Sequence, residues 1–384
     1  MNLNFWPKMY YSGGGGGGGD AGGGGGGDSG GSGGSGGGGG AEGSSGESSS
    51  LNTAPSGSIR FNTDSGRLEI YNGDQWWDIN STSPEQETGG TRGLWAGGNT
   101  PTYFNNIQFV NIQSTGNTAD FGDLTRVGNQ INAVSSRTRA VWGAQYDNSA
   151  VYNTMDFVTI ASTGDATNFG DLTVQRSGNQ PMQNATRGIF AGGMNHPAQN
   201  SVDTIDYITM ASEGNAVDFG NYVTVRQQRT SACSPTRGVL ARGGNPANTN
   251  AMEFFTISTL GNGTDFGDAT TADVAPLGTS SNAVRGILWT SSYAPNTTDV
   301  IDYITIATLG NALDFGDMNH ISYNGGACCA SPTRSVVGGG FDGGIAEEMD
   351  YVQIMTTGNA IDFGNLDQAR SEPGACSNGH GGLG

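Results

Sequence analysis

The sequence predicts an all-β protein built from a repeated unit. Short runs rich in β-branched and aromatic residues alternate with Gly, Asn and Pro, which is typical of strands and turns. No window shows a sustained helical period. One segment recurs six times around a phenylalanine, at intervals of 48, 50, 47, 49 and 48 residues. Its positions are Phe121, Phe169, Phe219, Phe266, Phe315 and Phe363. A fixed period of this size indicates a propeller or a solenoid.

Two other segments keep the same period. "TRGLWAGG" at Thr91 recurs in related form at Thr138, Thr186, Thr236, Val284 and Thr333. Between this segment and the phenylalanine lies a step of apolar, acidic and aromatic residues, such as Ile301-Asp302-Tyr303; the first copy has Gln108 at the acidic position. Six repeats therefore run from about residue 91 onward.

Each repeat is predicted to contain four antiparallel strands. A short inner strand ("SACS", 231–234) is followed by a tight turn ("SPTR") and a second strand that ends at a Gly pair. A loop of variable sequence leads to the third strand ("IDYITIA", 301–307), and a "TGN" turn leads to the fourth strand with its Phe. Four strands in nearly 50 residues match one propeller blade.

The last residues are predicted to close the ring. "GACSNGHGGLG" (374–384) matches the inner-strand segment "SACSPTRGVLA", whereas the first repeat begins only at its second strand. The C-terminal segment can therefore supply the missing strand and leave no free sheet edge. The prediction is a six-bladed β-propeller over residues 88–384.

The repeats resemble the Kelch type, a family that includes the propeller of galactose oxidase. The resemblance lies in the Gly pair after an apolar strand, the aromatic residue after an acidic one, and the aromatic residue of the fourth strand. The Kelch fourth-strand Trp is Phe in this chain. The resemblance implies the propeller fold and no particular ligand.

Residues that recur in every repeat are expected to serve the fold. Each fourth-strand Phe is expected to wedge between neighbouring sheets, which stabilises by roughly 2–3 kcal/mol per ring, and the Gly after it to permit a positive φ. The Asp residues around it are expected to bind their own turn backbone, with calcium as the alternative. The repeated Arg is expected to pair with a carboxylate of the acidic step or with a turn carbonyl. The Asp residues are Asp120, Asp123, Asp265 and Asp268. The repeated arginines are Arg92, Arg139, Arg187, Arg237, Arg285 and Arg334.

Residues 1–50 have a different composition. The segment 1–11 contains Phe5, Trp6, Tyr10 and Tyr11, lacks the apolar run of a signal peptide, and is expected to anchor the chain to a partner. Residues 12–50 are almost only Gly, Ser, Asp and Glu and cannot bury a core. They are expected to form a flexible tether, or, as the alternative, to bundle with the glycine runs of neighbouring copies.

Residues 51–82 are predicted to form a small β-meander. The turn signals Asp64-Ser65-Gly66 and Asn72-Gly73 separate three short strands, too few to be stable alone. The module is expected to pack on the propeller or on copies of itself as a homo-oligomer. The sequence "GSIRFNT…GRLEIYNG…WWDI" resembles a module of structural proteins of tailed bacteriophages, especially phages of marine cyanobacteria. That resemblance implies a virion protein.

Composition limits the partners and cofactors. Thirty-five acidic against sixteen basic residues argue against nucleic-acid binding. No segment is long enough to cross a membrane. Inner-strand positions hold Cys233, Cys376 and, in the fifth repeat, Cys328 and Cys329, which are expected to be small buried apolar residues. No metal or cofactor is expected.

No catalytic motif stands out. Asp120-Phe121-Gly122 matches a kinase motif, but it recurs and Lys8 is the only lysine, which excludes a kinase. The chain has no Gly-x-Ser-x-Gly or His-Glu-x-x-His motif. A propeller enzyme acting on receptor glycans remains the alternative to a non-enzyme.

Candidate ligand residues lie in the loops between second and third strands, whose sequences do not repeat. These loops carry rings of the kind that stack on sugars: Tyr103, Phe104, Tyr146, His196, Tyr293 and Phe341. The expected function is a fibre or decoration protein on the virion surface, assembled in the host cytoplasm, held by other virion proteins through its N-terminus, and adhering to host surface glycans. Passive decoration of the particle without a ligand is the alternative.

Overall fold

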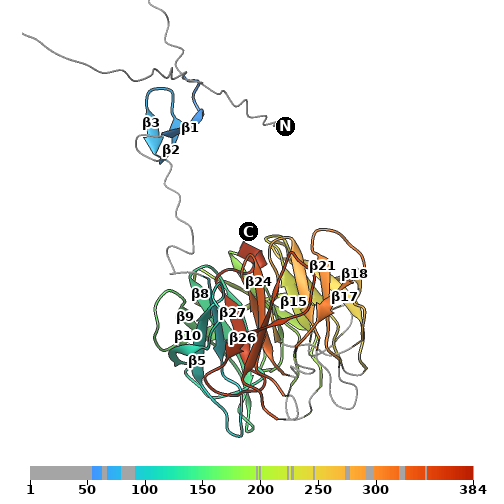
Figure 1. Ribbon diagram of the computed structural model, residues 1–384. Helices are drawn as coiled ribbons and strands as arrows, with labels where there is room; N and C mark the ends of the chain where they lie inside the picture. The colour runs from blue at the N-terminus through green and yellow to red at the C-terminus, as the bar shows by residue number, and fades with distance from the viewer. Residues whose placement is uncertain are drawn as a thin grey trace, which may run out of the picture. The chain divides into compact units, whose positions relative to one another are not determined.

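The chain divides into two units, residues 1–79 (unit 1) and 80–384 (unit 2), and its described residues form an all-β structure (Figure 1). The computed structural model describes residues 54–62, 67–78, 91–195, 198, 200–222, 225, 229–244, 247–272, 277–290, 298–319, 325–341 and 344–383. Within these ranges the helical structure is one short 3-10 helix, η1 (Gly381–Leu383). The predicted all-β class is confirmed. The predicted anchor (1–11) and tether (12–50) lie outside the described residues.

Unit 1 contains the predicted three-stranded meander. Strands β1 (Ile59–Asn62), β2 (Arg67–Tyr71) and β3 (Trp76–Asp78) pair antiparallel in chain order. The Asn72 side chain closes the second turn, because its Oδ1 accepts the backbone N–H groups of Asp74 and Gln75 at 2.9 Å.

The described part of unit 2 contains six sheets, numbered I to VI in the order of the repeats. Sheet I has β27 (Gly374–Ser377), β4 (Arg92–Ala96), β5 (Asn106–Asn111) and β6 (Ala119–Asp123); sheet II has β7 (Asn132–Ser135), β8 (Arg139–Tyr146), β9 (Val151–Thr159) and β10 (Thr167–Asp171); sheet III has β11 (Gln180–Gln183), β12 (Arg187–Ala191), β13 (Thr204–Thr209) and β14 (Val217–Asn221). Sheet IV has β15 (Thr230–Cys233), β16 (Arg237–Ala241), β17 (Ala251–Thr256) and β18 (Thr264–Asp268); sheet V has β20 (Arg285–Trp289), β21 (Val300–Thr305) and β22 (Leu313–Asp317); sheet VI has β19 (Leu277–Gly278), β23 (Ala327–Ala330), β24 (Arg334–Gly338), β25 (Glu348–Gln353) and β26 (Ile361–Asn365).

The C-terminal strand completes the first sheet as predicted. Strand β27 pairs antiparallel with β4, with Gly374 opposite Ala96 and Ser377 opposite Gly93. The first strands of the six repeats also contact one another in a closed circuit: β7 with β11, β11 with β15, β15 with β19, β19 with β23, β23 with β27, and β27 with β7.

The fifth repeat departs from the expected pattern. Its inner strand β19 has two residues and pairs in parallel with β23 of the next sheet, and Thr279 makes a parallel bridge to Ser231 of the previous one. Gly278 has a φ of 124°, which redirects the chain there. Cys328 and Cys329 belong to β23, so they lie in the sixth sheet and not in the fifth repeat as expected.

Six apolar clusters fill the spaces between consecutive sheets. One cluster packs Leu94 and Phe121 of sheet I against Ile131 and Trp142 of the second repeat. The cluster that joins sheet VI to sheet I packs Phe363 against Trp95. In all six repeats the fourth-strand Phe is between 1 and 3% exposed and meets the third-strand aromatic ring edge-on. The predicted wedge role of this Phe is therefore confirmed.

The glycine after each Phe allows the next sheet to approach closely. These residues have φ between 138 and 151°, and a Cβ added to any of them would lie under 3.0 Å from the carbonyl oxygen of the "TGN"-turn glycine in the following sheet. The N–H of the residue after each glycine donates, at 3.0–3.1 Å, to the Asn or Asp side chain of that turn. At Asp123 and Asp268 this link joins two sheets through the backbone N–H. The expected role of the carboxylates in their own turn stays a prediction.

Replacing Gly122 with Ala is expected to lower the free energy of unfolding by about 2–4 kcal/mol. The added Cβ would meet the Gly164 carbonyl, and the φ of 147° is strained for any residue with a Cβ. Gly116→Ala is the matched control, because Gly116 has a φ of 152° with open space around its Cβ position. The free energy of unfolding in urea is measured for both variants: Gly116→Ala reports backbone strain alone, and Gly122→Ala reports strain plus the collision. Equal decreases in the two variants would contradict the close contact between sheets.

The repeated arginines link sheets through carbonyl groups, and Arg139 also lies 3.7 Å from the Glu213 carboxylate of the next sheet. Each guanidinium lies 4.2–4.9 Å from the third-strand aromatic ring of its own sheet and donates, at 2.8–3.4 Å, to a backbone carbonyl just after the third strand of the next sheet. The series closes when Arg334 of sheet VI reaches Ile112 beside sheet I. Of the two predicted partners, the carbonyl is the correct one.

Residues 378–383, called the end segment, contact parts of all six repeats. Arg137 Nη2 donates to the Leu383 carbonyl at 3.0 Å, and Gly381 N–H donates to the Ser281 carbonyl at 2.8 Å. A Cβ added to any of the three inner glycines would collide with neighbouring atoms. The partners are Thr91 for Gly379, Asn282 and Cys233 for Gly381, and Gln183 for Gly382. Pro332 of the sixth repeat lies 3.3 Å from the Cβ position of Gly379. Glycine is required there because the neighbouring chains leave no room for a side chain.

Candidate functional site

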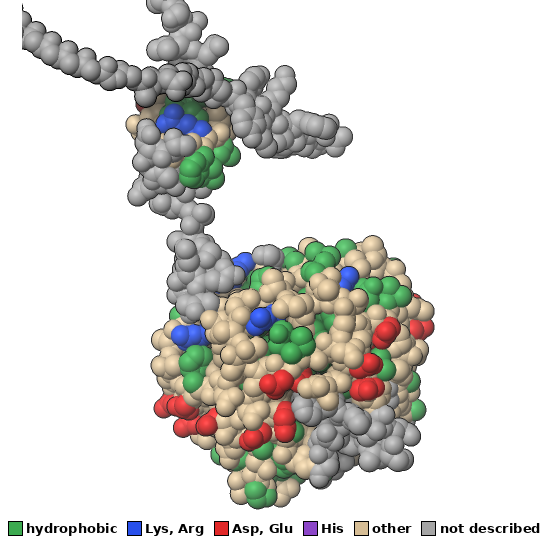
Figure 2. Space-filling view, viewed as in Figure 1, with side chains coloured by type: hydrophobic (Ala, Val, Ile, Leu, Met, Phe, Trp, Pro, Cys, Tyr) green, Lys and Arg blue, Asp and Glu red, His purple; other side chains and the backbone are tan. Residues whose placement is uncertain are grey.

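Unit 2 has two chemically different ends. Because the strands alternate in direction, the second-to-third-strand loops and the links between sheets share one end, called the loop end. The tight turns and the end segment share the other, called the turn end. In Figure 2 arginine side chains lie toward the turn end, and Asp and Glu lie closer to the loop end. The loops do not repeat in sequence, so ligand recognition is expected at the loop end.

Two of the predicted ring residues come together at the loop end. Tyr103 of the first loop and Tyr146 at the end of β8 pack edge-to-face, with ring centroids 6.4 Å apart and planes at 85°. Both rings are half-buried. Burial, with Tyr146, Glu372 and Asp147 nearby, raises the pKa of Tyr103 above its ordinary value, so its phenol is uncharged at neutral pH.

Main-chain bridges hold these two loops. Asn99 bridges both Tyr103 and Ser371, and Asn129 bridges Tyr146. The loop after Tyr146 is also ordered: the carboxylate of Asp147 accepts from Ser149 and from Tyr152 Oη, which lowers the pKa of Asp147. The tyrosine pair is therefore positioned before any ligand arrives.

The other predicted ring residues do not join this pair. Phe104 is half-buried and lies under Arg370, whose guanidinium carbon is 5.7 Å from its centroid. Phe341 is 47% exposed and pairs with Ile345 across its own loop in sheet VI. His196 and Tyr293 lie outside the described residues, as do the anchor residues Phe5, Trp6, Tyr10 and Tyr11.

Buried arginines at the loop end were not predicted. Arg176 and Asp206 are fully buried with Nη2 2.9 Å from Oδ2, Arg242 pairs with Asp302, and Arg229 pairs with Glu253. The same carboxylates of Asp206 and Asp302 accept from the Thr that follows the fourth strand of the previous sheet. The acidic step thus joins sheets together. The available signals were an Arg in the link before the first strand (Arg176, Arg229) and Arg242 at the place of a glycine.

Arg370 differs from the other three. Its guanidinium donates to the carbonyls of Gly97 and Asn106 and to the Asn106 side chain at 3.0–3.4 Å. Burial lowers its pKa to about 10, which leaves it charged at neutral pH. Its donors are directed into the protein rather than toward a ligand.

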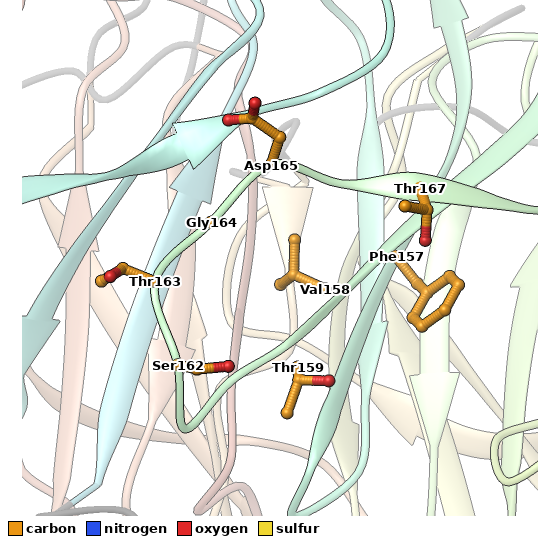
Figure 3. Close-up of a pocket in the computed structure, with 8 residues that line it drawn as sticks. All are labelled: Phe157, Val158, Thr159, Ser162, Thr163, Gly164, Asp165 and Thr167. Carbon is orange, nitrogen blue, oxygen red and sulfur yellow. The ribbon is translucent and has the colours of Figure 1, made fainter.

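Two hollows open on the turn end. One, of about 270 Å³, follows the β9–β10 hairpin, and Figure 3 shows that its side chains point in different directions instead of converging. Its one carboxylate, Asp165, already accepts from the Asp123 N–H. The other, of about 430 Å³, is lined in part by Arg137 and Arg139. Neither lining set contains a nucleophile paired with a base.

The described residues contain no group of three or more His, Cys, Asp or Glu that could hold a metal ion. Cys233, Cys328, Cys329 and Cys376 are buried free thiols, and burial raises the pKa of Cys233, Cys328 and Cys376 to about 12. This agrees with their expected role as small buried side chains. Within the described ranges, no helix is long and apolar enough to span a membrane.

Unit 1 presents an apolar surface. Alternation and register place five side chains on one side of its sheet, here called the apolar face: Ile59, Phe61, Leu68, Ile70 and Trp77, each between 38 and 62% exposed. The opposite side is polar and internally satisfied, since Arg60 pairs with Glu69 at 2.8 Å and stacks over Trp76 at 4.2 Å. An exposed apolar surface of this kind is typical of interaction sites.

Comparison with known proteins leaves the chain without an assigned family. No family model matches it, and no curated protein sequence matches it.

Proposed function

We propose that unit 2 is a six-bladed β-propeller of the Kelch-like type. Three observations support this. The first strands contact one another in a closed circuit, and one of the six apolar clusters lies between sheets VI and I. The series of arginine links also returns from sheet VI to sheet I, through Arg334 and the Ile112 carbonyl. The pairing of β27 with β4 matches the closure of such a ring.

The function we propose is display of this propeller on the outside of a bacteriophage particle, for adhesion to glycans of the host surface. The observation that carries adhesion is the preorganised Tyr103–Tyr146 pair in non-repeating loops. Thr91, the first described residue of unit 2, lies beside the end segment, so it is at the opposite end of the strands from the non-repeating loops. The virion context rests on the resemblance of residues 56–79 and on the aromatic residues of the 1–11 segment.

Binding of the full chain to glycans extracted from host envelopes tests adhesion. The expected result is saturable binding that is lost in Tyr146→Ala while the unfolding midpoint is unchanged. Absence of binding to every envelope fraction would favour passive decoration, and turnover of a bound glycan would favour the enzyme alternative.

We further propose that unit 1 self-associates through the apolar face. A three-stranded meander buries too little to be stable alone, and its five exposed side chains would be covered by other copies. Light scattering of the full chain is expected to give an oligomer, and Phe61→Glu with Trp77→Glu is expected to give a monomer. Glu69→Gln, on the opposite side, is the control; a monomeric wild-type chain would contradict self-association.

A further inference from the structure

One backbone position at the loop end is left-handed in every repeat where it is described. It lies two residues before the first strand and is occupied by Gly325, Glu372, Gln130 and Gly178, with φ of 68, 54, 51 and 63°. Successive members are linked around the sheets: the N–H of Glu372 donates to the Gly325 carbonyl, that of Gln130 to Glu372 at 2.9 Å, and that of Gly178 to Gln130 at 2.8 Å. The fold therefore imposes this φ whichever residue is present.

Glycine is the residue that such a position favours, and two repeats use it. Glu372 and Gln130 adopt the same φ although their Cβ atoms make it unfavourable, and such strain concentrates at functional sites. The two side chains are partly exposed and face each other, with Gln130 Nε2 3.4 Å from Glu372 Oε1. The positive φ does not explain why Glu and Gln occupy these positions, because glycine adopts that φ without strain.

The two side chains belong to a polar network beside the tyrosine pair. Asn129 Nδ2 donates to Glu372 Oε2 at 2.5 Å, and Ser177 Oγ donates to Gln130 Oε1 at 2.8 Å. Asn129 also bridges Tyr146 through the backbone. The aromatic rings and the polar groups are thus fixed relative to each other, and burial raises the pKa of Glu372.

Resting on the proposed adhesion function, we infer that Glu372, Gln130 and the Tyr103–Tyr146 pair form one binding site for an uncharged carbohydrate. Sugar hydroxyls donate to a carboxylate and exchange hydrogen bonds with an amide, while the C–H face of the ring packs on an aromatic side chain. The chain has a net charge of −19, and Glu372 and Asp147 both act on Tyr103, so an anionic glycan is repelled. Arg370 offers an anionic group no hydrogen-bond donor there, because its guanidinium donates into the protein, to Gly97 and Asn106.

The test uses the full chain with Gln130→Gly and Glu372→Gly combined. Glycine relieves the strain at both positions but removes the bonds to Asn129 and Ser177, so the unfolding midpoint is expected to change little. Affinity for neutral glycans on an array is expected to fall at least ten-fold. Glu347→Gln, which removes another exposed carboxylate of the loop end, is the control and is expected to bind as the wild type does.

The outcomes separate this site from the general proposal. Wild-type binding that the double glycine variant retains would overturn the site while leaving adhesion intact, and a preference for sialylated or uronic-acid glycans would overturn the ligand class. No binding of any glycan would overturn both. If the double variant does not fold, Tyr103→Ala decides, and unchanged binding in that variant would overturn the site.

Discussion

Deleting residues 374–384 is expected to abolish cooperative unfolding of unit 2. The deletion removes β27 and leaves the fully buried edge of β4 (Leu94, Trp95 and Ala96) without a partner. It also opens the clusters that hold Cys376 and Ala375 and removes the end segment from all six repeats. The loss is comparable with the whole stability of a typical domain, about 5–15 kcal/mol.

Calorimetry of the truncated chain checks this expectation. Deletion of residues 1–50 is the control and is expected to leave the main transition in place. A synthetic peptide of residues 374–384, added to the truncated chain, is expected to restore part of the transition because it replaces one defined strand. A truncated chain that unfolds at the wild-type temperature would show that the pairing of β27 with β4 does not stabilise unit 2.

Acid is expected to weaken the end segment through His380. This ring is 2% exposed; its Nε2 donates to the Ser135 carbonyl at 2.8 Å, and its Nδ1 accepts from the Gly382 N–H at 3.1 Å. A protonated ring would direct an N–H at the Gly382 N–H, and Arg137 is also nearby. Burial therefore lowers the pKa of His380 from 6.5 to about 4.

The direction of the pH effect follows from that shift. The unfolded chain takes up the proton near pH 6.5 and the folded chain only near pH 4, so this stabilisation is complete above pH 6.5 and is lost as the pH falls toward 4. The shift corresponds to about 3 kcal/mol. The free energy of unfolding in urea, compared at pH 7 and pH 4.5, is expected to fall less in His380→Gln than in the wild type. Equal pH dependence in both proteins would contradict the buried neutral ring.

The repeat could be predicted from the sequence because it reflects contacts made six times. The Phe, the following Gly and the Arg each recur since every pair of neighbouring sheets needs the same wedge, close approach and carbonyl link. Even the pairing of the C-terminal strand with the first repeat could be predicted, because residues 374–377 match the inner strands of other repeats. The third-strand and fourth-strand positions were correct for the same reason.

Features that occur in single repeats could not be predicted in this way. Arg242 replaces the first glycine of a Gly pair, and only the structure shows that it reaches Asp302 of the next sheet. Glu372 and Gln130 carry no sequence mark of a positive φ. The short β19 resembles other inner segments, but Gly278 redirects it. In each case the conformation depends on contacts with a neighbouring sheet, and the sequence of one strand does not show which residues of that sheet it contacts.

The same limit applies to the candidate site. The aromatic rings were found because loops of variable sequence stand out against a constant repeat. Which rings meet depends on how the loops fold over the sheets: Tyr103 and Tyr146 come together, whereas Phe341 remains in its own loop. The polar half of the site was missed because Glu372 lies in a link between sheets and not in a loop within one.

Blocking one end of unit 2 at a time is the most direct test of adhesion through the loop end. Thr102 and Thr163 are exposed, at the loop end and the turn end respectively, and the native thiols are buried, so a single introduced cysteine can be coupled to polyethylene glycol. Adhesion of the full chain to host envelopes is then measured. The expected result is loss of adhesion for coupled Thr102→Cys and normal adhesion for coupled Thr163→Cys. Adhesion blocked only from the turn end, or equally from both ends, would contradict a binding site at the loop end.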